Sequence, residues 1–423
     1  MQAIEREQKV IYEASTLSIA DVLGFGSDDG YIFQSPEYSI SGSNKCSVID
    51  IPDGLETENL SNFIDQSLGD SVIRGAIYKS GHEKKEGPNC LPIVLAAFDF
   101  EGGQPTQCFV PDEVLLRYRD GSGMLIRQKQ DSKGTESIKY HKGTLSTPNP
   151  PEEFHLSSNI SHSDFKDLII KAVSKIVAGE FDKVVLAREI TIKADRKFQP
   201  SVILERLNSL FPSCAIFSID GFVGASPELL IKKSGSMIKA KPLAGTTGRS
   251  GDEKSDNDAI EKLLNSQKNQ EEHGFVVKEI LSSLTGFCKE IDTSPKPEIV
   301  SLRNVCHLAT DISGLLIDPD ISILELVRMI HPTPAVGGYP RQPAKQAISE
   351  FENFSRGRYA GAVGWFDGSG DGEWYVGIRS AQLQGTTAKI MAGVGIVKDS
   401  DSESELIETQ LKFQAMLSAI VRP

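Results

Sequence analysis

The final third of the chain contains three apolar segments in close succession, joined by stretches too short to hold a helix. The segments cover residues 359–366, 373–383 and 388–397, and the first connection is the Gly/Asp-rich stretch 367–372. Consecutive strands joined by such turns pair antiparallel, because a parallel pair needs a crossover of a dozen or more residues. Helical patterns occur elsewhere in the chain. The sequence therefore predicts an α+β fold rather than a doubly wound parallel sheet.

Apolar residues recur at helical spacing in several other segments. In residues 164–177 they form a single stripe, and Ser163 stands where the residue that caps a helix is expected. The longest pattern, over 257–284, predicts one continuous helix. Shorter patterns predict helices over 201–210 and 403–420, and strands over 183–192, 214–219, 228–233 and 237–241.

Length alone suggests two or three domains for a chain of 423 residues. However, no proline-rich, serine-rich or charged tract divides the chain into independent halves. The clearest break covers residues 144–159 and contains three prolines. We interpret it as a crossing loop inside one large unit. Residues 1–150 then form an N-terminal scaffold portion, and residues 160–423 the portion that carries the chemical motifs.

The overall charge and the cysteines limit the possible partners and the compartment. A net charge of −13 argues against nonspecific binding to nucleic acid or to an anionic membrane. The six cysteines are far apart and include no CxxC pair, which indicates buried thiols in a reducing compartment. Residues 1–15 lack the apolar core of a signal peptide, and no stretch approaches the roughly 20 apolar residues of a spanning helix. We therefore expect a cytoplasmic protein without a membrane or nucleic-acid partner.

The predicted helix over 403–420 carries charged residues on one face. Glu405, Glu408 and Lys412 follow one another at i, i+3 and i+7, and the same face becomes apolar toward the end of the chain. This pattern predicts that the charged half lies over a cavity. Carboxylates at a cavity bind a divalent cation such as Mg²⁺, and the cation in turn implies an anionic substrate.

Two charged residues outside this helix are candidate partners. Glu272 lies near the apolar stripe of the predicted helix 257–284, where it could face the cavity and share a Mg²⁺ ion with Glu408, or flank the stripe in solvent. Lys183 precedes three apolar residues of its strand. It could be a poorly solvated amine that acts as a base, or an ordinary charge at a sheet edge.

Three further positions have a functional and a structural interpretation. Glu228 follows a proline at the start of a strand. It could be a buried neutral acid that donates a proton, or a turn residue that faces solvent. Arg379 could bind a carboxylate or form a cross-strand ion pair. The glycine-threonine loop 242–249 offers backbone N–H groups to an anion but lacks the spacing of a phosphate-binding loop. A fourth position, His331, could be catalytic, but the two prolines around Thr333 favour a rigid wall.

Together these motifs resemble the chorismate-utilising enzymes, the group that includes anthranilate synthase component I, and among them most closely the isochorismate synthases. Each motif is weakly specific alone, but the set follows the family order from residue 181 to the end of the chain. The matching segments are 181–188, 226–228, 242–249, 271–273, 331–340, 361–367, 378–381, 393–397 and 405–412. The resemblance implies a single large two-layered α+β domain, with antiparallel sheets flanked by helices and a central cleft.

The resemblance also implies a reaction, the Mg²⁺-dependent isomerisation of chorismate to isochorismate. Water is added at C2 of the ring while the C4 hydroxyl leaves. By their positions in the motifs, Lys183 would be the base that activates water and Glu228 the acid that protonates the departing hydroxyl. Because water is a poor nucleophile and hydroxide a poor leaving group, the reaction needs both groups, with separated pKa values.

The same comparison of motifs implies the binding residues. Glu272 and Glu408, supported by Glu405, would hold Mg²⁺ against the ring carboxylate. The implied substrate-binding residues are Gly245, Thr246, Ala335, Arg379, Gly395 and Lys412.

Enzymes of this family that catalyse other reactions differ from the isochorismate synthases at few positions of these motifs. Ala244 stands where aminodeoxychorismate synthases typically have a nucleophilic lysine, and Lys183 favours water over the ammonia of anthranilate synthases. We therefore expect a monomer without a glutamine amidotransferase subunit. The alternatives are a salicylate synthase, which also eliminates pyruvate, and a noncatalytic chorismate-binding homologue. Leu406, where the family commonly has tryptophan, departs from the pattern.

Overall fold

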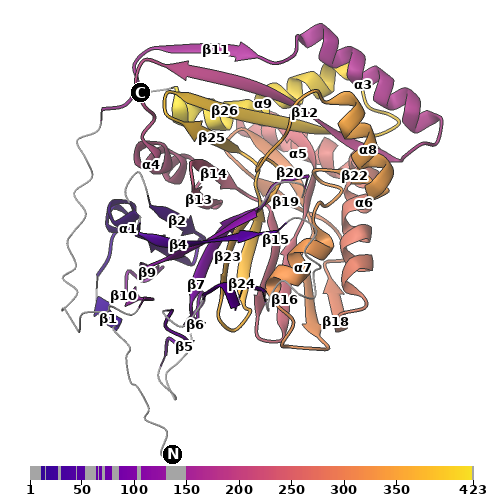
Figure 1. Cartoon of the computed structure of the whole chain (residues 1–423). Coiled ribbons are helices and arrows are strands. Elements are labelled where there is room, and N and C mark those ends of the chain that lie inside the picture. The colour runs from indigo at the N-terminus through magenta and orange to yellow at the C-terminus, as the bar shows by residue number, and fades with distance from the viewer. Residues whose placement is uncertain are drawn as a thin grey trace, which may run out of the picture.

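Two large β-sheets with helices packed against them make up the computed structural model (Figure 1). Every pairing between the described strands is antiparallel, and the α+β prediction is confirmed. The structure describes residues 11–14, 16–26, 30–43, 45–52, 63–64, 66–68, 72–78, 85–101, 106–129 and 149–421.

The larger sheet contains twelve of the described strands. Along its path these are β1 (Ile11–Ala14), β10 (Gly123–Arg127), β9 (Glu113–Tyr118), β3 (Tyr38–Gly42), β2 (Tyr31–Gln34), β13 (Ala215–Ile219), β14 (Phe222–Ser226), β25 (Ser380–Gln384), β26 (Thr387–Ile396), β12 (Lys183–Ala194) and β11 (Phe154–Ser158), with β22 (Gly338–Tyr339) paired to β12. The longest pairing joins β12 to β26, with Val185 opposite Gly395 and Ala187 opposite Gly393. These two strands form one wall of the cavity described below.

A second sheet and a small third sheet complete the β-structure around that cavity. The second sheet follows the order β18 (Cys288–Thr293), β21 (Ile312–Leu316), β16 (Met237–Lys241), β15 (Leu229–Ser234), β24 (Gly372–Val376), β23 (Ala362–Asp367), β7 (Ile93–Ala97), β8 (Thr106–Pro111) and β4 (Cys46–Ile51). The third sheet consists of β17 (Leu243–Gly248), β20 (Val305–Ala309) and β19 (Glu298–Ser301).

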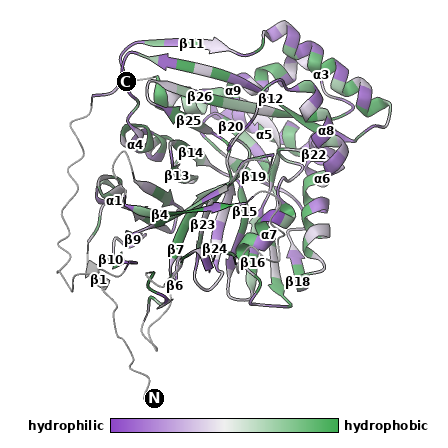
Figure 2. Ribbon diagram, in the orientation of Figure 1, coloured by the Kyte–Doolittle hydropathy of each residue, from purple (hydrophilic) through white to green (hydrophobic). Residues whose placement is uncertain are grey.

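Helices cover the sheets on the outside. They are α1 (Ile19–Gly26), α3 (His162–Val177), α4 (Pro200–Leu210), α5 (Glu253–Asn265), α6 (Gln267–Leu284), α7 (Ile323–Ile330), α8 (Arg341–Phe351) and α9 (Ser402–Ile420). In Figure 1, α3 and α9 lie beside β12 and β26. Figure 2 shows hydrophobic residues along β7 and β26 and hydrophilic residues along the outward side of α3. None of the helices in the described part of the chain is both long and apolar enough to span a bilayer.

The predicted strand 373–383 is wrong, because the chain changes sheets within it. β24 belongs to the second sheet and β25 to the first. Between them, Arg379 adopts a positive φ of 52°, and Gly377 passes so close to the Arg358 carbonyl that a Cβ would lie 2.9 Å from it. Only three residues separate the two strands, so the pattern of side chains alone could not reveal the crossing.

The predicted continuous helix 257–284 is also wrong. Ser266 has an extended ψ of 112° and separates α5 from α6. Its hydroxyl accepts a hydrogen bond from the Asn269 N–H at 3.3 Å and so caps α6. Serine competes for backbone groups in this way, which favours a helix start over a helix interior. The break lets α6 approach the cavity independently of α5.

Two shorter expectations are corrected as well. Part of the region interpreted as a crossing loop, 144–159, is the strand β11, which pairs with β12 from Phe154–Ala194 to Ser158–Ile190; residues 144–148 lie outside the described part. The cap of α3 is Ser161 rather than Ser163, since the Ser161 hydroxyl accepts from the Asp164 N–H at 3.1 Å.

Strands from the N-terminal portion pair with strands from the rest of the chain in both large sheets. β2 pairs with β13, with Phe33 opposite Phe217, and β7 pairs with β23, with Leu95 opposite Trp365. The side chains of these four residues are almost fully buried in one apolar cluster between the two sheets. The two sheets are therefore held together by residues from both ends of the sequence.

The assignment of Ser161 as the cap of α3 predicts that replacing Ser161 lowers the free energy of unfolding more than replacing Ser163 does. Ser161→Ala removes the acceptor for the Asp164 N–H, so we expect a loss of about 1 kcal/mol in the free energy of unfolding. Ser163→Ala is the matched control, because Ser163 is exposed in the first turn of α3, and it should change stability by less than about 0.5 kcal/mol. Urea denaturation of both variants tests this, and an equal effect at the two positions would contradict the assignment.

Candidate active site

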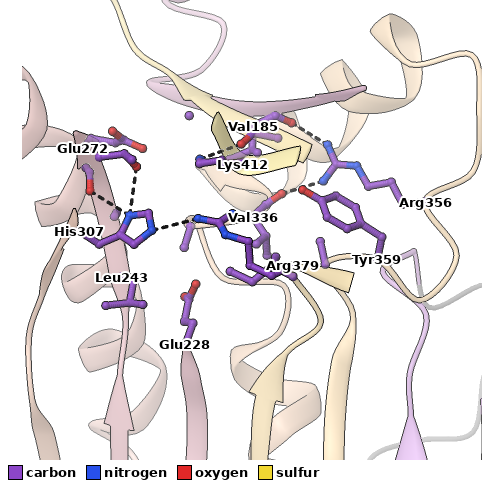
Figure 3. Close-up of a pocket in the computed structure, with 18 residues that line it drawn as sticks. Val185, Glu228, Leu243, Glu272, His307, Val336, Arg356, Tyr359, Arg379 and Lys412 are labelled. Carbon is purple, nitrogen blue, oxygen red and sulfur yellow. Dashed lines mark hydrogen bonds between the residues drawn. The ribbon is translucent and has the colours of Figure 1, made fainter. Parts of the chain in front are cut away.

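A cavity of about 560 Å³, part of it open to solvent, lies where β12 and β26 face the small third sheet and the start of β15 (Figure 3). Its walls come from distant parts of the sequence and carry both charged and apolar groups. The lining residues are Val185, Glu228, Leu243, Ala244, Gly245, Thr246, Glu272, His307, Ala335, Val336, Arg356, Tyr359, Ala360, Ile378, Arg379, Gly393, Gly395 and Lys412. Eight of the predicted site residues, from Glu228 to Lys412, are among them.

Lys183 lies beside this cavity rather than at a sheet edge in solvent. Its side chain is fully buried, and Nζ lies 3.1 Å from Glu272 Oε1. The two residues come from β12 and α6, so the contact joins sheet to helix. The ammonium makes no well-aligned hydrogen bond within the described part of the chain. A substrate or water at the cavity wall could therefore supply one.

Gly395 permits this contact between Lys183 and Glu272. A Cβ at position 395 would collide with the Glu272 carboxylate and would lie 2.9 Å from Lys183 Cε. Only glycine allows the two charged side chains to meet across β26 at this point. The glycine at this position of β26 is therefore required, because the side chains of Glu272 and Lys183 approach the strand closely there.

Glu228 is buried between β14 and β15, and its environment keeps its carboxyl group neutral. Burial is the main cause that raises its pKa, to about 8, while a backbone hydrogen bond at Leu243 and the charges of Lys183, Lys412 and Arg379 oppose the rise. The acid is therefore mostly protonated at neutral pH and has a proton to donate. Figure 3 shows its side chain directed toward Arg379 and His307.

A histidine connects Arg379 to Thr246 on β17. The prediction of a glycine-threonine loop over 242–249 is wrong, because residues 243–248 pair with β20 as a strand. Arg379 Nη2 lies 3.0 Å from His307 Nε2, and Nδ1 lies 3.1 Å from the Thr246 hydroxyl and 3.4 Å from the Gly245 carbonyl (Figure 3). Burial and then the charge of Arg379 lower the pKa of His307 to about 3, so the ring is neutral. Because the guanidinium can only donate, Nε2 accepts and Nδ1 carries the proton.

The neutral histidine leaves the Arg379 charge available. No carboxylate within the described residues lies within ion-pair distance of this guanidinium, although Arg379 is largely buried. The predicted alternative, a cross-strand ion pair, is absent from the described part. A buried arginine with only a neutral partner is a site for an anion.

Three carboxylates gather where α6 and α9 approach the cavity, and each has a lysine partner. The pairs are Lys183 with Glu272 at 3.1 Å, Lys412 with Glu408 at 2.6 Å, and Lys268 with Glu405. Burial and the neighbouring charge of Glu408 raise the pKa of Glu405 to about 7. Burial acts to raise the pKa of Glu408, whereas its pairing with Lys412 acts to lower it. The pairing prevails, so the pKa of Glu408 is lowered.

This group of carboxylates has the donor chemistry that Mg²⁺ prefers. All are oxygen donors, they come from two helices, and the charges of Glu272 and Glu408 both act on Glu405. Within the described residues, no three acidic, histidine or cysteine side chains already converge closely enough to hold a metal ion. The lysines balance the negative charge of these acids instead.

Lys412, on α9, lines the cavity next to β26. The β25–β26 pairing extends only as far as Ala381 and Ile390, because the chain crosses between sheets just before β25. Beyond that point the Gly393 carbonyl accepts a hydrogen bond from Lys412 Nζ at 2.8 Å. The sheet crossing and the last helix thereby place Arg379 and Lys412 at the same cavity.

Sequence reasoning missed several lining residues. His307 lacks the spacing of a metal ligand, and neither Tyr359 nor Arg356 is part of the motifs quoted above. Arg356 is fully buried and donates to Val336 O at 2.8 Å and Val185 O at 2.7 Å, which fixes two stretches of the cavity wall. The available signal was His307 within the apolar segment 305–309. His331 does not line the cavity; its ring packs edge-on against Phe100.

Comparisons with known proteins agree with this geometry. A family model described as chorismate binding enzyme matches residues 60–421. Isochorismate synthase MenF of Bacillus subtilis (strain 168) is 39% identical over 361 residues, covering 80% of this chain and 76% of the relative. Isochorismate synthase DhbC of the same organism is 31% identical over 402 residues, covering 92% and 93%. The structure of MenF, the menaquinone-specific isochorismate synthase from Escherichia coli, has the same fold, with a TM-score of 0.77 at 23% identity and coverage of 98% and 95%.

The raised pKa of Glu228 predicts a specific pH dependence of stability. Its folded pKa of about 8 exceeds the ordinary value of 4.5, so its contribution to stability is lost progressively as the pH rises from about 4.5 through about 8. Glu228→Gln lacks this ionisation and should gain stability relative to wild type over that interval. Urea denaturation across pH, with the exposed Glu261→Gln as control, measures the difference. A constant difference at all pH values would contradict the assignment.

Proposed function

Because the chain belongs to the family of chorismate-binding enzymes, we propose that it converts chorismate to isochorismate with Mg²⁺ as cofactor. The observation that carries the proposal is the pairing of a buried amine with a neutral buried acid at one cavity. Lys183 lies on β12 and Glu228 between β14 and β15, and Arg379 and Lys412 line the same cavity as Glu228. The relatives with matching length are named isochorismate synthases.

The reaction replaces one hydroxyl by another, and it balances without any oxidant or reductant. Water adds at C2 of the chorismate ring, the double bond shifts, and the C4 hydroxyl leaves as water. One proton must leave the incoming water and one must reach the departing oxygen. The enzyme therefore needs a base and an acid near opposite ends of the reacting atoms.

Lys183 is proposed to be the base and Glu228 the acid. Because only a neutral amine can accept a proton, Lys183 has to lose the proton that it carries in its ion pair with Glu272 before it can act. Lys183 is held in one place by full burial and by its contact with Glu272, which orients the amine toward the cavity wall at Gly395. Glu228, with a pKa of about 8, holds its proton at neutral pH and can donate it to the leaving hydroxyl. The different environments of the two groups give them complementary roles.

Chorismate carries two carboxylates, and the cavity offers two cations for them. Arg379 has only a neutral histidine as hydrogen-bond partner in the described part, and Lys412 is directed to the Gly393 carbonyl. Gly245, with a positive φ of 76°, and Gly395 expose backbone to the ligand, and Thr246 and Ala335 complete the wall. We propose that these groups bind and orient the substrate.

Glu272, Glu405 and Glu408 are proposed to hold Mg²⁺. When bound, the ion would neutralise and position the ring carboxylate of chorismate. The enzyme needs no glutamine amidotransferase subunit, since water rather than ammonia is the nucleophile. All these residues lie within 160–423, so we propose that residues 1–150 serve as scaffold of the same fold.

The proposed reaction is tested by product analysis. Purified protein incubated with chorismate and Mg²⁺ should form isochorismate as the main early product, separated by chromatography. Removal of Mg²⁺ with a chelator should stop product formation, and restoring the ion should recover it. Salicylate with stoichiometric pyruvate as the early product would instead indicate a salicylate synthase. Binding of chorismate without turnover would indicate a noncatalytic homologue.

The role of Lys183 gives a separate prediction. Lys183→Ala should lower the rate of isochorismate formation by at least about 10²-fold, because the water loses its base, while chorismate binding by calorimetry changes much less. Lys193→Ala, an exposed lysine on the same strand, is the control and should keep wild-type activity. Proportional loss of binding and rate in Lys183→Ala would contradict a role in the chemical step.

A further inference from the structure

Arg188 is a buried cation that the proposed reaction does not use. It lies on β12, five residues after Lys183, and is only 2% exposed. No carboxylate within the described residues lies within ion-pair distance, and burial alone lowers the pKa of its guanidinium. Placing an unpaired charge in the interior is costly. We therefore expect the Arg188 side chain to have a role that compensates for the cost of burying its charge.

The contacts of Arg188 all lead to α9 and to the neighbouring helix α3. The guanidinium lies between two aromatic rings, 5.1 Å from the centroid of Phe165 on α3 and 5.4 Å from that of Phe413 on α9. Its Nη2 and Nε donate to the Thr409 hydroxyl at 2.6 and 3.2 Å. These contacts need the planar, forked shape of arginine, which lysine lacks.

Thr409 connects Arg188 to the turn of α9 that carries Glu405 and Glu408. Its hydroxyl donates to the Leu406 carbonyl at 2.7 Å, and its side chain is fully buried. Leu406 and Thr409 directly follow Glu405 and Glu408 in the sequence. Arg188 is thus bonded to the one turn of helix that carries both carboxylates, on the side of α9 that packs against the sheet.

We infer that Arg188, acting through Thr409, is a positioning residue that fixes the rotation and height of α9 and thereby the placement of Glu405 and Glu408 for Mg²⁺. This inference rests on the proposed metal-binding role of these two glutamates. The strand that holds Lys183 also holds Arg188, so one rigid strand sets both the base and the acidic turn of α9. Residues that orient metal ligands without touching the ion typically change metal affinity by about 10–100-fold when replaced.

The experiment measures Mg²⁺ binding directly, by calorimetric titration of the protein with Mg²⁺ in the absence of substrate. Arg188→Lys and Thr409→Val should weaken Mg²⁺ binding by about 10-fold or more, whereas Thr409→Ser, which keeps the hydroxyl, should bind like wild type. Thermal unfolding monitors the fold of every variant. Thr409→Val keeps the shape of the side chain, so it tests the inference even where Arg188→Lys is unstable.

A second arginine provides the matched control. Arg206 Nη1 donates to the Ala419 carbonyl at 3.0 Å and anchors the far end of α9, three turns beyond the carboxylates. Arg206→Lys should lower thermal stability yet leave the Mg²⁺ affinity unchanged. Equal weakening in the Arg206 variant would show a general loosening of α9 and would overturn the inference.

The failure of the inference and that of the proposed metal site give different results. Glu408→Gln should weaken Mg²⁺ binding if the metal site is correct. Weakening in Glu408→Gln with wild-type affinity in Arg188→Lys and Thr409→Val would overturn the positioning role alone. A wild-type protein that binds no Mg²⁺, or a Glu408→Gln variant that binds normally, would overturn the metal site and the inference with it.

Discussion

The ion pair between Lys183 and Glu272 is the contact on which the architecture of the cavity depends. It joins β12, the longest strand of the larger sheet, to α6, and it forms across Gly395, where any side chain would collide with the carboxylate. The pair fixes how closely the helix approaches the sheet. A buried ion pair is costly to form but specific in geometry, since neither charge can move away without losing its partner. Glu405 and Glu408 on α9 lie close to this ion pair, so their positions are defined relative to it.

The distribution of charge around the cavity differs from that of the whole molecule. The chain carries a net charge of −13, yet the cavity is lined or flanked by Lys183, Lys412 and Arg379. Glu228, which lines the same cavity, is kept neutral by burial, and His307 is neutral for the same reason. Burial thus removes the negative charge of Glu228, which would otherwise act against a dianionic ligand. Local environment, not overall composition, makes the cavity suitable for an anion.

Much of the site could be predicted from sequence because its residues sit in recognisable local contexts. The helical spacing of Glu405, Glu408 and Lys412 placed them on one face of a real helix. The segment around Gly245 was expected to be a loop but is the strand β17, with an irregular register at Gly245. The sheet crossing near Arg379 could not be predicted in this way. Two buried strands in a row have the same alternation whether they continue one strand or begin another. The break at Ser266 was missed because a single serine weakly interrupts a strong helical pattern.

Spacing between near neighbours in the chain was enough to predict the antiparallel α+β class, the helix with its acidic turn and the order of the motifs. Which charges are neutralised, and which are left without a partner, depends instead on the tertiary structure. His307 on β20 joins Thr246 on β17 to Arg379, which lies between β24 and β25, and Arg188 meets Thr409 over an interval of more than two hundred residues. Protonation and charge pairing depend on burial and on contacts between distant segments, and neither quantity is encoded in any local pattern.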